Sequence, residues 1–178
     1  MDELQIERIL RQQKWTKKTF NGVYSSNTLP KTRITERPCG MVVNTDQDDE
    51  PGSHWIAIYL DENGHGEYFD SYGLFPMSKH ILDFLNKQTK NNWTFNKRQL
   101  QHVLTTMCGA YCIFFLVYRG QYKRPMYEII DMMFPVNESV PLANDFKVQK
   151  SLYQRFGLNI PIIESDFVAQ KINEMYKH

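Results

Sequence analysis

An almost uninterrupted run of apolar and aromatic residues is the feature that most constrains how this chain can fold. Residues 109–118 contain no charge and no proline, and they are too few to cross a bilayer, which takes about 20 apolar residues. Such a run is either a buried strand or a helix that is apolar all round. Thr105 and Thr106 before the run can cap a helix, while Arg119 and Gly120 after it are typical of a helix end. The pattern therefore favours a central helix buried on every side.

Cys108 would then stand at the start of this helix, where unpaired N–H groups and the helix dipole favour an anion. A thiol in that position ionises more readily and becomes a stronger nucleophile. Gly109 leaves room for a substrate backbone beside it. The alternative is that Cys108 is a small apolar core residue, as we expect for Cys112 one turn further on. Which interpretation of Cys108 is correct depends on whether the rest of the chain supplies the partners that a nucleophile needs.

The composition is that of a globular protein and restricts its partners. The chain has 178 residues, of which 42% are hydrophobic and 13% aromatic, so we expect residues 1–178 to form a single domain with a sizeable core. A net charge of +1 gives no general attraction to nucleic acid or to anionic membranes. Three cysteines argue against a secreted disulfide scaffold, and no cysteine–histidine spacing resembles a zinc site. Because the charged N-terminus also lacks a signal-peptide core, we predict a protein of a reducing compartment, the cytosol or the nucleus.

Residues 54–60 and 67–70 have the composition of two strands, and the Asp-Glu-Asn-Gly sequence between them indicates a turn. In an antiparallel hairpin with a loop of this length, paired residues have numbers that add to roughly 124–127. His54 and Asp70 then meet at the open end of the hairpin, on the same face if the value is even. A carboxylate that accepts the Nδ1–H of a histidine fixes its tautomer and raises its basicity. The alternative is a structural His–Asp pair at the edge of a sheet.

Other segments follow helical or strand periodicity and are expected to complete the fold. Residues 14–38 are polar and rich in turn signals, and residues 45–52 form an acidic stretch that we expect to be a solvated loop. The Met and aromatic stripes of the later helices are expected to be core. Further helices are expected at residues 2–13, 78–87, 126–134, 143–156 and 165–176, and further strands at 40–44 and 93–97.

The chain offers four residues suited to hydrolysis by a cysteine, in the order His54, Asp70, Gln101 and Cys108. The reaction needs a thiolate, a base that forms it, a group that orients the base, and donors to the oxyanion of the tetrahedral intermediate. Cys108, His54 and Asp70 can fill the first three roles. The backbone N–H at the start of the helix and the side-chain amide of Gln101, seven residues before the cysteine, can be the donors.

The sequence around these residues contains four motifs: Val42-Val43-Asn44-Thr45, Gly52-Ser53-His54-Trp55, Tyr68-Phe69-Asp70-Ser71-Tyr72-Gly73, and Gln101 ahead of Cys108-Gly109-Ala110-Tyr111-Cys112. Together they resemble the adenovirus-type cysteine proteases, the adenains, and most nearly the adenain-like proteases of Polinton/Maverick elements and adenovirus-like viruses. The resemblance covers most of the chain. It implies an α+β papain-like fold of the adenain type, with a central mixed or antiparallel sheet packed on the helix that begins near Cys108.

The same resemblance implies the role of each site residue. His54 is the general base, Asp70 its orienter, Cys108 the nucleophile, and Gln101 a donor in the oxyanion hole. Viral adenains usually have Glu at the position of Asp70, whereas the element-borne relatives and the proteases of ubiquitin-like modifiers have Asp. Either carboxylate can hold an imidazole, so the chemistry tolerates this departure.

The resemblance also implies a function, which is endopeptidase cleavage of viral or transposon-encoded capsid or core precursor proteins after small residues such as glycine. The expected location is the host nucleus or cytoplasm, or the virion. No cofactor is expected to be required. By resemblance the partners include an activating capsid-derived peptide or DNA, but residues 90–107 offer no cysteine for a covalent peptide and the net charge gives DNA little support. Two alternatives stay open: a protease of ubiquitin-like modifiers (a deubiquitinase or deSUMOylase), and a catalytically inactive binding or structural module.

Overall fold

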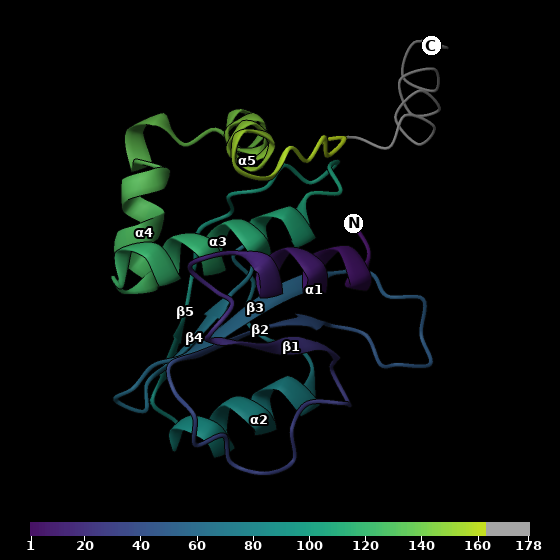
Figure 1. The fold of residues 1–178 in the computed structure, drawn as a ribbon, viewed down its shortest axis with the longest axis vertical. Helices are drawn as coiled ribbons and strands as arrows, with labels where there is room; N and C mark the ends of the chain where they lie inside the picture. The colour runs from purple at the N-terminus through teal and green to yellow at the C-terminus, as the bar shows by residue number, and fades with distance from the viewer. Residues whose placement is uncertain (163–178) are drawn as a thin grey trace.

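The computed structural model describes residues 1–162, which form a five-stranded mixed sheet with helices on both faces. The strands follow one another across the sheet in chain order, antiparallel in the middle and parallel at both edges (Figure 1). The predicted α+β architecture, with a central sheet packed on the helix that starts at Cys108, is therefore confirmed. The elements are α1 (Glu3–Gln12), β1 (Phe20–Ser25), β2 (Cys39–Asn44), β3 (Trp55–Leu60), β4 (Gly66–Phe69), α2 (Lys79–Thr89), β5 (Trp93–Phe95), α3 (Cys108–Tyr122), α4 (Met126–Met133), the 3-10 helix η1 (Val136–Glu138) and α5 (Pro141–Phe156).

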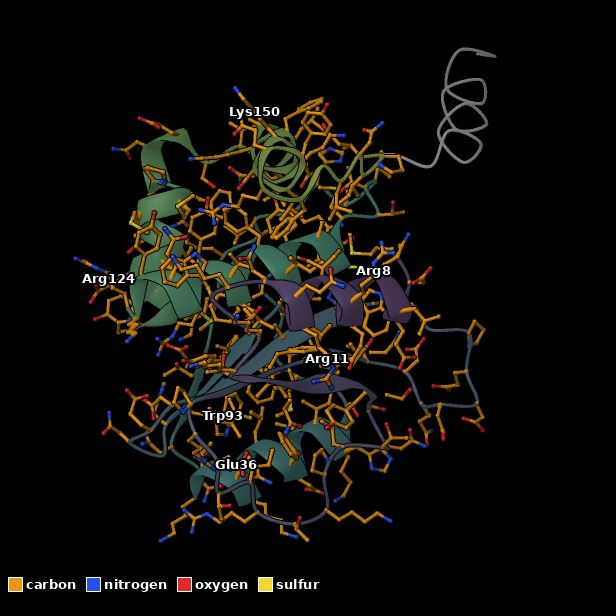
Figure 2. All side chains as sticks on the ribbon, viewed as in Figure 1. Arg8, Arg11, Glu36, Trp93, Arg124 and Lys150 are labelled. Carbon is orange, nitrogen blue, oxygen red and sulfur yellow. The ribbon has the colours of Figure 1, made fainter. Side chains whose placement is uncertain are left out.

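Each face of the sheet has its own apolar core. Successive side chains of a strand point to opposite faces, so Val42 and Ala57 pack with α3 while Val43 and Ile56 pack with α2. Figure 1 shows α2 alone below the sheet, with α1, α3, α4 and α5 above it. Figure 2 shows side chains filling the space between these layers, with Arg8 and Lys150 on the outside. Because both faces are covered, the central strands read as continuous apolar runs rather than alternating ones.

The apolar run at residues 109–118 lies in the central helix α3. It lies on β3 and is covered by α1, α4 and α5, and its residues from Gly109 to Arg119 are all buried. This surrounding explains why the helix has no polar stripe. Truncating a core side chain such as Phe115 to alanine should cost about 3–5 kcal/mol. Among the described residues, no helix is long and apolar enough to cross a membrane.

Both ends of α3 differ from the prediction. The residue that caps the N-terminus is Met107, which makes no side-chain capping bond, so capping by Thr105 or Thr106 was wrong. The Thr105 hydroxyl instead donates to a carboxylate of α5. The helix also continues past Gly120 to Tyr122. A Cβ on Gly120 would lie 2.3 Å from the carbonyl oxygen of Trp15, so this glycine permits close packing rather than ending the helix.

Residues 14–38 were expected to be irregular, but they contain the edge strand β1, which pairs in parallel with β2. The Asn21-Gly22 signal that suggested a break marks an irregularity in the register between Phe20 and Gly22, and the strand continues beyond it. The other expected helices and strands within residues 1–162 are present, with ends shifted by a few residues. The helix predicted at 165–176 lies outside the described residues.

Candidate active site

The β3–β4 hairpin brings a histidine and an aspartate together. Ala57 pairs with Phe69 and Ile58 with Tyr68, so paired residue numbers add to 126, an even value within the predicted range. His54 directly precedes β3 and Asp70 directly follows β4, and the His54 Nε2 lies 3.0 Å from Asp70 Oδ1. The predicted pairing is confirmed, but the nitrogen is Nε2 and not Nδ1. The Nδ1 side of the ring is thereby left for a second partner.

Asp70 is 2% exposed, and both its carboxylate and its backbone are held by hydrogen bonds. Its Oδ1 also accepts the backbone N–H of Tyr72 at 2.7 Å. The side chain of Asn96, just after β5, accepts the backbone N–H of Asp70 at 2.8 Å and donates to its carbonyl at 2.6 Å. A carboxylate fixed in this way can orient an imidazole and stabilise its positive charge. Nothing in the sequence distinguished Asn96 from other polar residues that follow a strand.

The second partner of His54 is Cys108, the first residue of α3. Burial alone would raise the pKa of the Cys108 thiol, but the hydrogen bond and positive charge of His54 outweigh it, with help from the backbone at Trp55 and Gly109, and lower that pKa. Burial alone would lower the pKa of His54, but its interactions with Asp70 and Cys108 raise it to about 9. The two shifts in opposite directions favour a thiolate–imidazolium pair at neutral pH.

The other two cysteines have the opposite character. Burial raises the pKa of Cys39 to about 11, and burial followed by the negative charges of Cys108 and Asp70 raises the pKa of Cys112 well above its usual value. Both side chains are buried, whereas Cys108 is partly exposed. Only Cys108 combines access with a stabilised thiolate, as a nucleophile requires. Cys112 is the core residue that the sequence predicted.

Gln101 lies in the same network, fully buried. Its Oε1 accepts the Ser71 hydroxyl at 2.7 Å, and its Nε2 donates to the carbonyl of Thr105 at 2.7 Å and to the hydroxyl of Tyr72 at 3.1 Å. The structure therefore brings Gln101 to the site, with both amide N–H groups engaged by protein oxygens. Its donation to an oxyanion stays a prediction.

Tyr72 joins the catalytic groups, although sequence reasoning gave it no role. Its ring stacks on the His54 ring with centroids 5.0 Å apart and an interplanar angle of 29°. Its backbone N–H donates to Asp70 and its hydroxyl accepts from Gln101. The motif Asp70-Ser71-Tyr72-Gly73 was visible in the sequence, but the stacking depends on the hairpin register that places residue 72 opposite residue 54.

A buried carboxylate of α5 fixes the loop that leads to Cys108. Asp145 is 0% exposed, and its Oδ2 accepts the Thr105 hydroxyl at 2.9 Å and the His102 backbone N–H at 3.2 Å. Its Oδ1 accepts the Tyr111 hydroxyl of α3 at 2.9 Å. Burial, only partly offset by these donors, raises the pKa of Asp145. Helix α5 is thus tied to the loop before Cys108, a contact that could not be predicted from the sequence.

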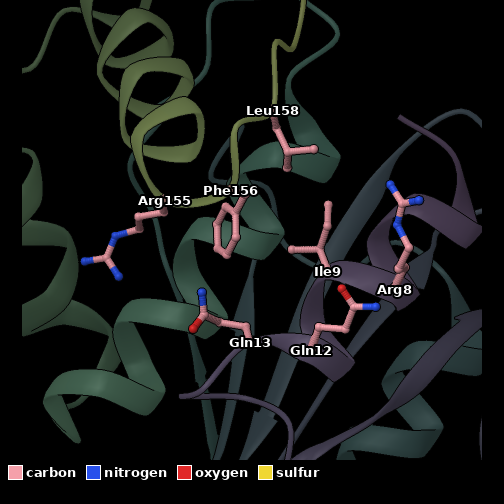
Figure 3. Close-up of a pocket in the computed structure, with 7 residues that line it drawn as sticks. All are labelled: Arg8, Ile9, Gln12, Gln13, Arg155, Phe156 and Leu158. Carbon is pink, nitrogen blue, oxygen red and sulfur yellow. The ribbon is translucent and has the colours of Figure 1, made fainter.

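A separate hollow of about 530 Å³ lies between α1 and the end of α5, as Figure 3 shows. Its lining consists of arginine, glutamine and apolar side chains and includes no nucleophile or base: Arg8, Ile9, Gln12, Gln13, Arg155, Phe156 and Leu158. It is therefore not the candidate active site. Within residues 1–162, no group of three or more His, Cys, Asp or Glu side chains is arranged to hold a metal ion.

Comparison with known proteins gives viral relatives over part of the chain. No model of a protein family matches the sequence. A "Cysteine protease" of African swine fever virus (isolate Tick/Malawi/Lil 20-1/1983) is 32% identical over 97 residues, which cover 47% of this chain and 36% of that protein. A "SUMO-1 cysteine protease" of the isolate Tick/South Africa/Pretoriuskop Pr4/1996 is 31% identical over the same extent. The chain thus spans about a third of the length of these curated relatives.

Solved structures give weaker similarities. The African swine fever virus protease crystal structure has a TM-score of 0.44 and 24% identity, covering 63% of this chain and 44% of that one. ChlaDub1 from Chlamydia trachomatis has a TM-score of 0.36 and 22% identity, covering 56% of this chain and 49% of that one.

Proposed function

We propose that this chain is a cysteine protease with Cys108 as nucleophile, His54 as general base and acid, and Asp70 as the group that orients the histidine. The observation that carries the proposal is the Cys108–His54–Asp70 arrangement, in which the thiol pKa is lowered and the imidazole pKa is raised to about 9. The cysteine proteases that match 47% of the chain support it.

The proposed reaction begins with attack of the Cys108 thiolate on the carbonyl carbon of the scissile bond. A C–S bond forms, and the carbonyl oxygen becomes an oxyanion. His54 then gives its proton to the leaving nitrogen, the C–N bond breaks, and a thioester on Cys108 remains. His54, now neutral, takes a proton from water, and the resulting hydroxide attacks the thioester. Breaking the C–S bond releases the carboxylic acid and restores the thiolate and the imidazolium.

The oxyanion would be stabilised at the start of α3. The backbone N–H of Cys108 is one proposed donor, because the first N–H groups of a helix lack partners within the helix. Gln101 is the second. Of the two hydrogen bonds that its side-chain amide donates, the one to the Tyr72 hydroxyl is longer, at 3.1 Å, than the one to the Thr105 carbonyl, at 2.7 Å. This is the bond that Gln101 would exchange for the oxyanion.

We propose a ubiquitin-like modifier, joined to its target through a C-terminal glycine, as the substrate. The name of one matched relative, a SUMO-1 cysteine protease, favours this choice. A small residue before the scissile bond fits the narrow surroundings of Gly109, where an added Cβ would lie 3.3 Å from Trp55 and 3.2 Å from Ile6. The capsid or core precursors of a virus or transposon are the second candidate, supported by the adenain-like motifs alone.

A matched pair of substrates separates the two candidates. One is a folded ubiquitin-like modifier fused through its terminal glycine to a reporter, and the other is an unstructured peptide with the same residues around the bond. We expect kcat/KM to be higher for the fusion and cleavage after the glycine, with Cys108→Ala as the inactive control. Equal rates for the two substrates would favour precursor processing. Absence of cleavage of both, together with unselective thiol labelling, would contradict the protease itself.

The same assay tests whether a peptide or DNA activates the chain. We expect turnover without a cofactor and without a bound peptide or nucleic acid. Double-stranded DNA and peptides from the substrate are therefore added in separate reactions. A rate that rises several-fold with DNA, and falls again at high salt, would show that DNA activates the chain electrostatically despite its near-neutral net charge.

A further inference from the structure

The loop that follows Asp70 exposes large apolar side chains beside the candidate active site. Leu74 is 56%, Phe75 47% and Met77 88% exposed. They form one wall of a pocket of about 380 Å³ that reaches the side chains of both His54 and Asp70. Concave sites with an apolar wall and a few polar groups are typical binding sites for a ligand or a substrate side chain.

The loop is fixed in this position by its own contacts. Gly73 has a φ of +72° and donates its N–H to the Asp70 carbonyl at 2.8 Å. A Cβ on Gly73 would lie 2.6 Å from the backbone of Arg98, so only glycine fits this turn. The Phe75 ring packs edge-on against Phe95 with centroids 5.4 Å apart. Leu74 and Met77 are therefore held out in solvent, where apolar area is unfavourable unless a partner covers it.

The position of the pocket relative to the reacting atoms indicates which part of a substrate it faces. Its lining includes His54 and Asp70 but not Cys108 or Gly109. The acyl part of a substrate becomes attached to Cys108, whereas the leaving nitrogen takes its proton from His54. Resting on the proposed protease function, we propose that this pocket binds an apolar side chain of the polypeptide that follows the scissile bond.

The acidic part of the lining adds a charge preference. It contains Thr45 and Asp46, and the loop beyond it continues with Asp48, Asp49 and Glu50 and has no lysine or arginine. A carboxylate placed in the pocket would meet this acidic wall at the cost of its own hydration. The preferred residue is therefore an uncharged apolar one such as leucine or methionine, and aspartate is excluded.

A set of five substrates that differ only after the scissile bond tests the proposal. All substrates share one sequence ending in glycine before the scissile bond. The first is a methyl ester, whose leaving group, methanol, carries no side chain, and the others are quenched fluorescent peptides with Leu, Met, Ala or Asp in the first position after the bond. We expect kcat/KM to be about 10–100-fold higher for Leu or Met than for Asp, the range that apolar pockets discriminate.

The variant Leu74→Ser/Met77→Ser should lower kcat/KM for the Leu peptide about tenfold, to the level of the Ala peptide, and leave that for the methyl ester unchanged. Val136→Ser, which alters an equally exposed side chain elsewhere (71%), should change none of the rates. Asp46→Asn should raise the rate for the Asp peptide alone.

Three outcomes would overturn the pocket assignment while leaving the protease intact. Equal rates for the four peptides would show that no selection occurs after the bond. Equal slowing of the methyl ester and the peptides in the double variant would place the loop's effect on the acyl side. An unchanged Leu peptide rate in that variant would remove the apolar wall from recognition. If the unmodified chain cleaves no substrate and Cys108 reacts no faster than Cys39, the proposed function fails instead.

Discussion

Each end of α3 places an ionisable group against the β3–β4 hairpin, but the two ends use it differently. At the C-terminal end, the Arg119 Nε donates to Glu67 Oε2 at 2.7 Å, and both side chains are buried. The other carboxylate oxygen of Glu67 accepts the first N–H of α4, that of Met126, at 2.7 Å. The guanidinium also lies 4.3 Å from the Tyr59 ring. Every part of this pair is used to join β4, α3 and α4.

At the N-terminal end, Cys108 and His54 form a pair that is only partly closed. The imidazole interacts with both Asp70 and Cys108, yet Cys108 remains partly exposed and His54 lines an open pocket. A buried pair with all its hydrogen bonds made contributes to the architecture, whereas a pair with an accessible reactive atom can do chemistry. The comparison therefore predicts that substitutions at the N-terminal end of α3 lower turnover, whereas substitutions at its C-terminal end lower the stability of the fold.

The largest expected effect is at the N-terminal end. Cys108→Ala should lower kcat by about 10⁴–10⁶-fold, because the covalent route is lost and only binding and oxyanion stabilisation remain. The midpoint of urea unfolding should stay close to that of the unmodified chain. Turnover is measured on the fluorescent peptide, and a substantial residual rate would show that the sulfur is not the nucleophile.

Gln101→Ala should lower kcat by about 10²–10³-fold, as the loss of one oxyanion donor does. The effect should fall on kcat rather than on KM, because the donor acts on charge that develops in the transition state. Gln99→Ala changes an exposed amide two residues away and should leave kcat nearly unchanged. A change of KM alone in Gln101→Ala would mean that this side chain only positions the loop.

Glu67→Ala tests the opposite end of the helix. It leaves Arg119 buried without a partner, which should lower the free energy of unfolding by about 3–5 kcal/mol. Asp83→Ala breaks an exposed ion pair with Lys79 and should cost about 1 kcal/mol or less. The folded fraction of Glu67→Ala should keep its turnover. If Glu67→Ala lowered kcat but left the free energy of unfolding unchanged, the C-terminal end of α3 would have a catalytic role rather than a structural one.

The parts of this molecule that sequence predicts best are those whose cause is local. The apolar run predicted α3 because a helix buried on all sides needs no polar stripe. The length of the β3–β4 turn predicted that His54 would meet Asp70, because register follows from loop length. The order of His54, Asp70, Gln101 and Cys108 could then be interpreted as one site.

The parts that sequence missed depend on neighbours distant along the chain. Asn96 holds Asp70 only because β5 pairs with β4, and Asp145 holds the loop before Cys108 only because α5 packs on α3. The strand β1 was missed because its six residues are half polar and contain Asn21-Gly22, and its pairing with β2 outweighs that weak propensity. Nothing in the sequence near Glu67 or Arg119 predicts that these two side chains form an ion pair.

Thiol labelling as a function of pH examines the N-terminal pair directly. With its pKa lowered, Cys108 should react with iodoacetamide at a rate that rises with pH and levels off below pH 9, while Cys39, with a pKa of about 11, and the buried Cys112 stay slow. Each unit of pKa corresponds to about a tenfold change in thiolate fraction at a given lower pH.

His54→Ala should move the labelling profile of Cys108 to higher pH, because the imidazolium that offsets burial is gone. Turnover of the unmodified chain should decline above about pH 9, where His54 loses its proton and the leaving nitrogen loses its acid. Peptide mass spectrometry measures the labelling of each cysteine. Equal labelling of all three cysteines, or a profile insensitive to His54, would leave a folded domain without an activated nucleophile.

The smallest effect concerns Tyr72, whose hydroxyl and ring contact different partners. Tyr72→Phe removes the hydroxyl that accepts from Gln101 and should change kcat by about 2–10-fold, the worth of one neutral hydrogen bond. The pH profile of Cys108 labelling should not move, because the ring that stacks on His54 remains. Tyr72→Leu removes the ring as well and should shift that profile upward, since an aromatic face stabilises a cation. If Tyr72→Phe moved the profile as far as Tyr72→Leu, the hydroxyl rather than the ring would support the Cys108–His54 ion pair. Gln101, which donates to that hydroxyl, would then support the ion pair as well as the oxyanion.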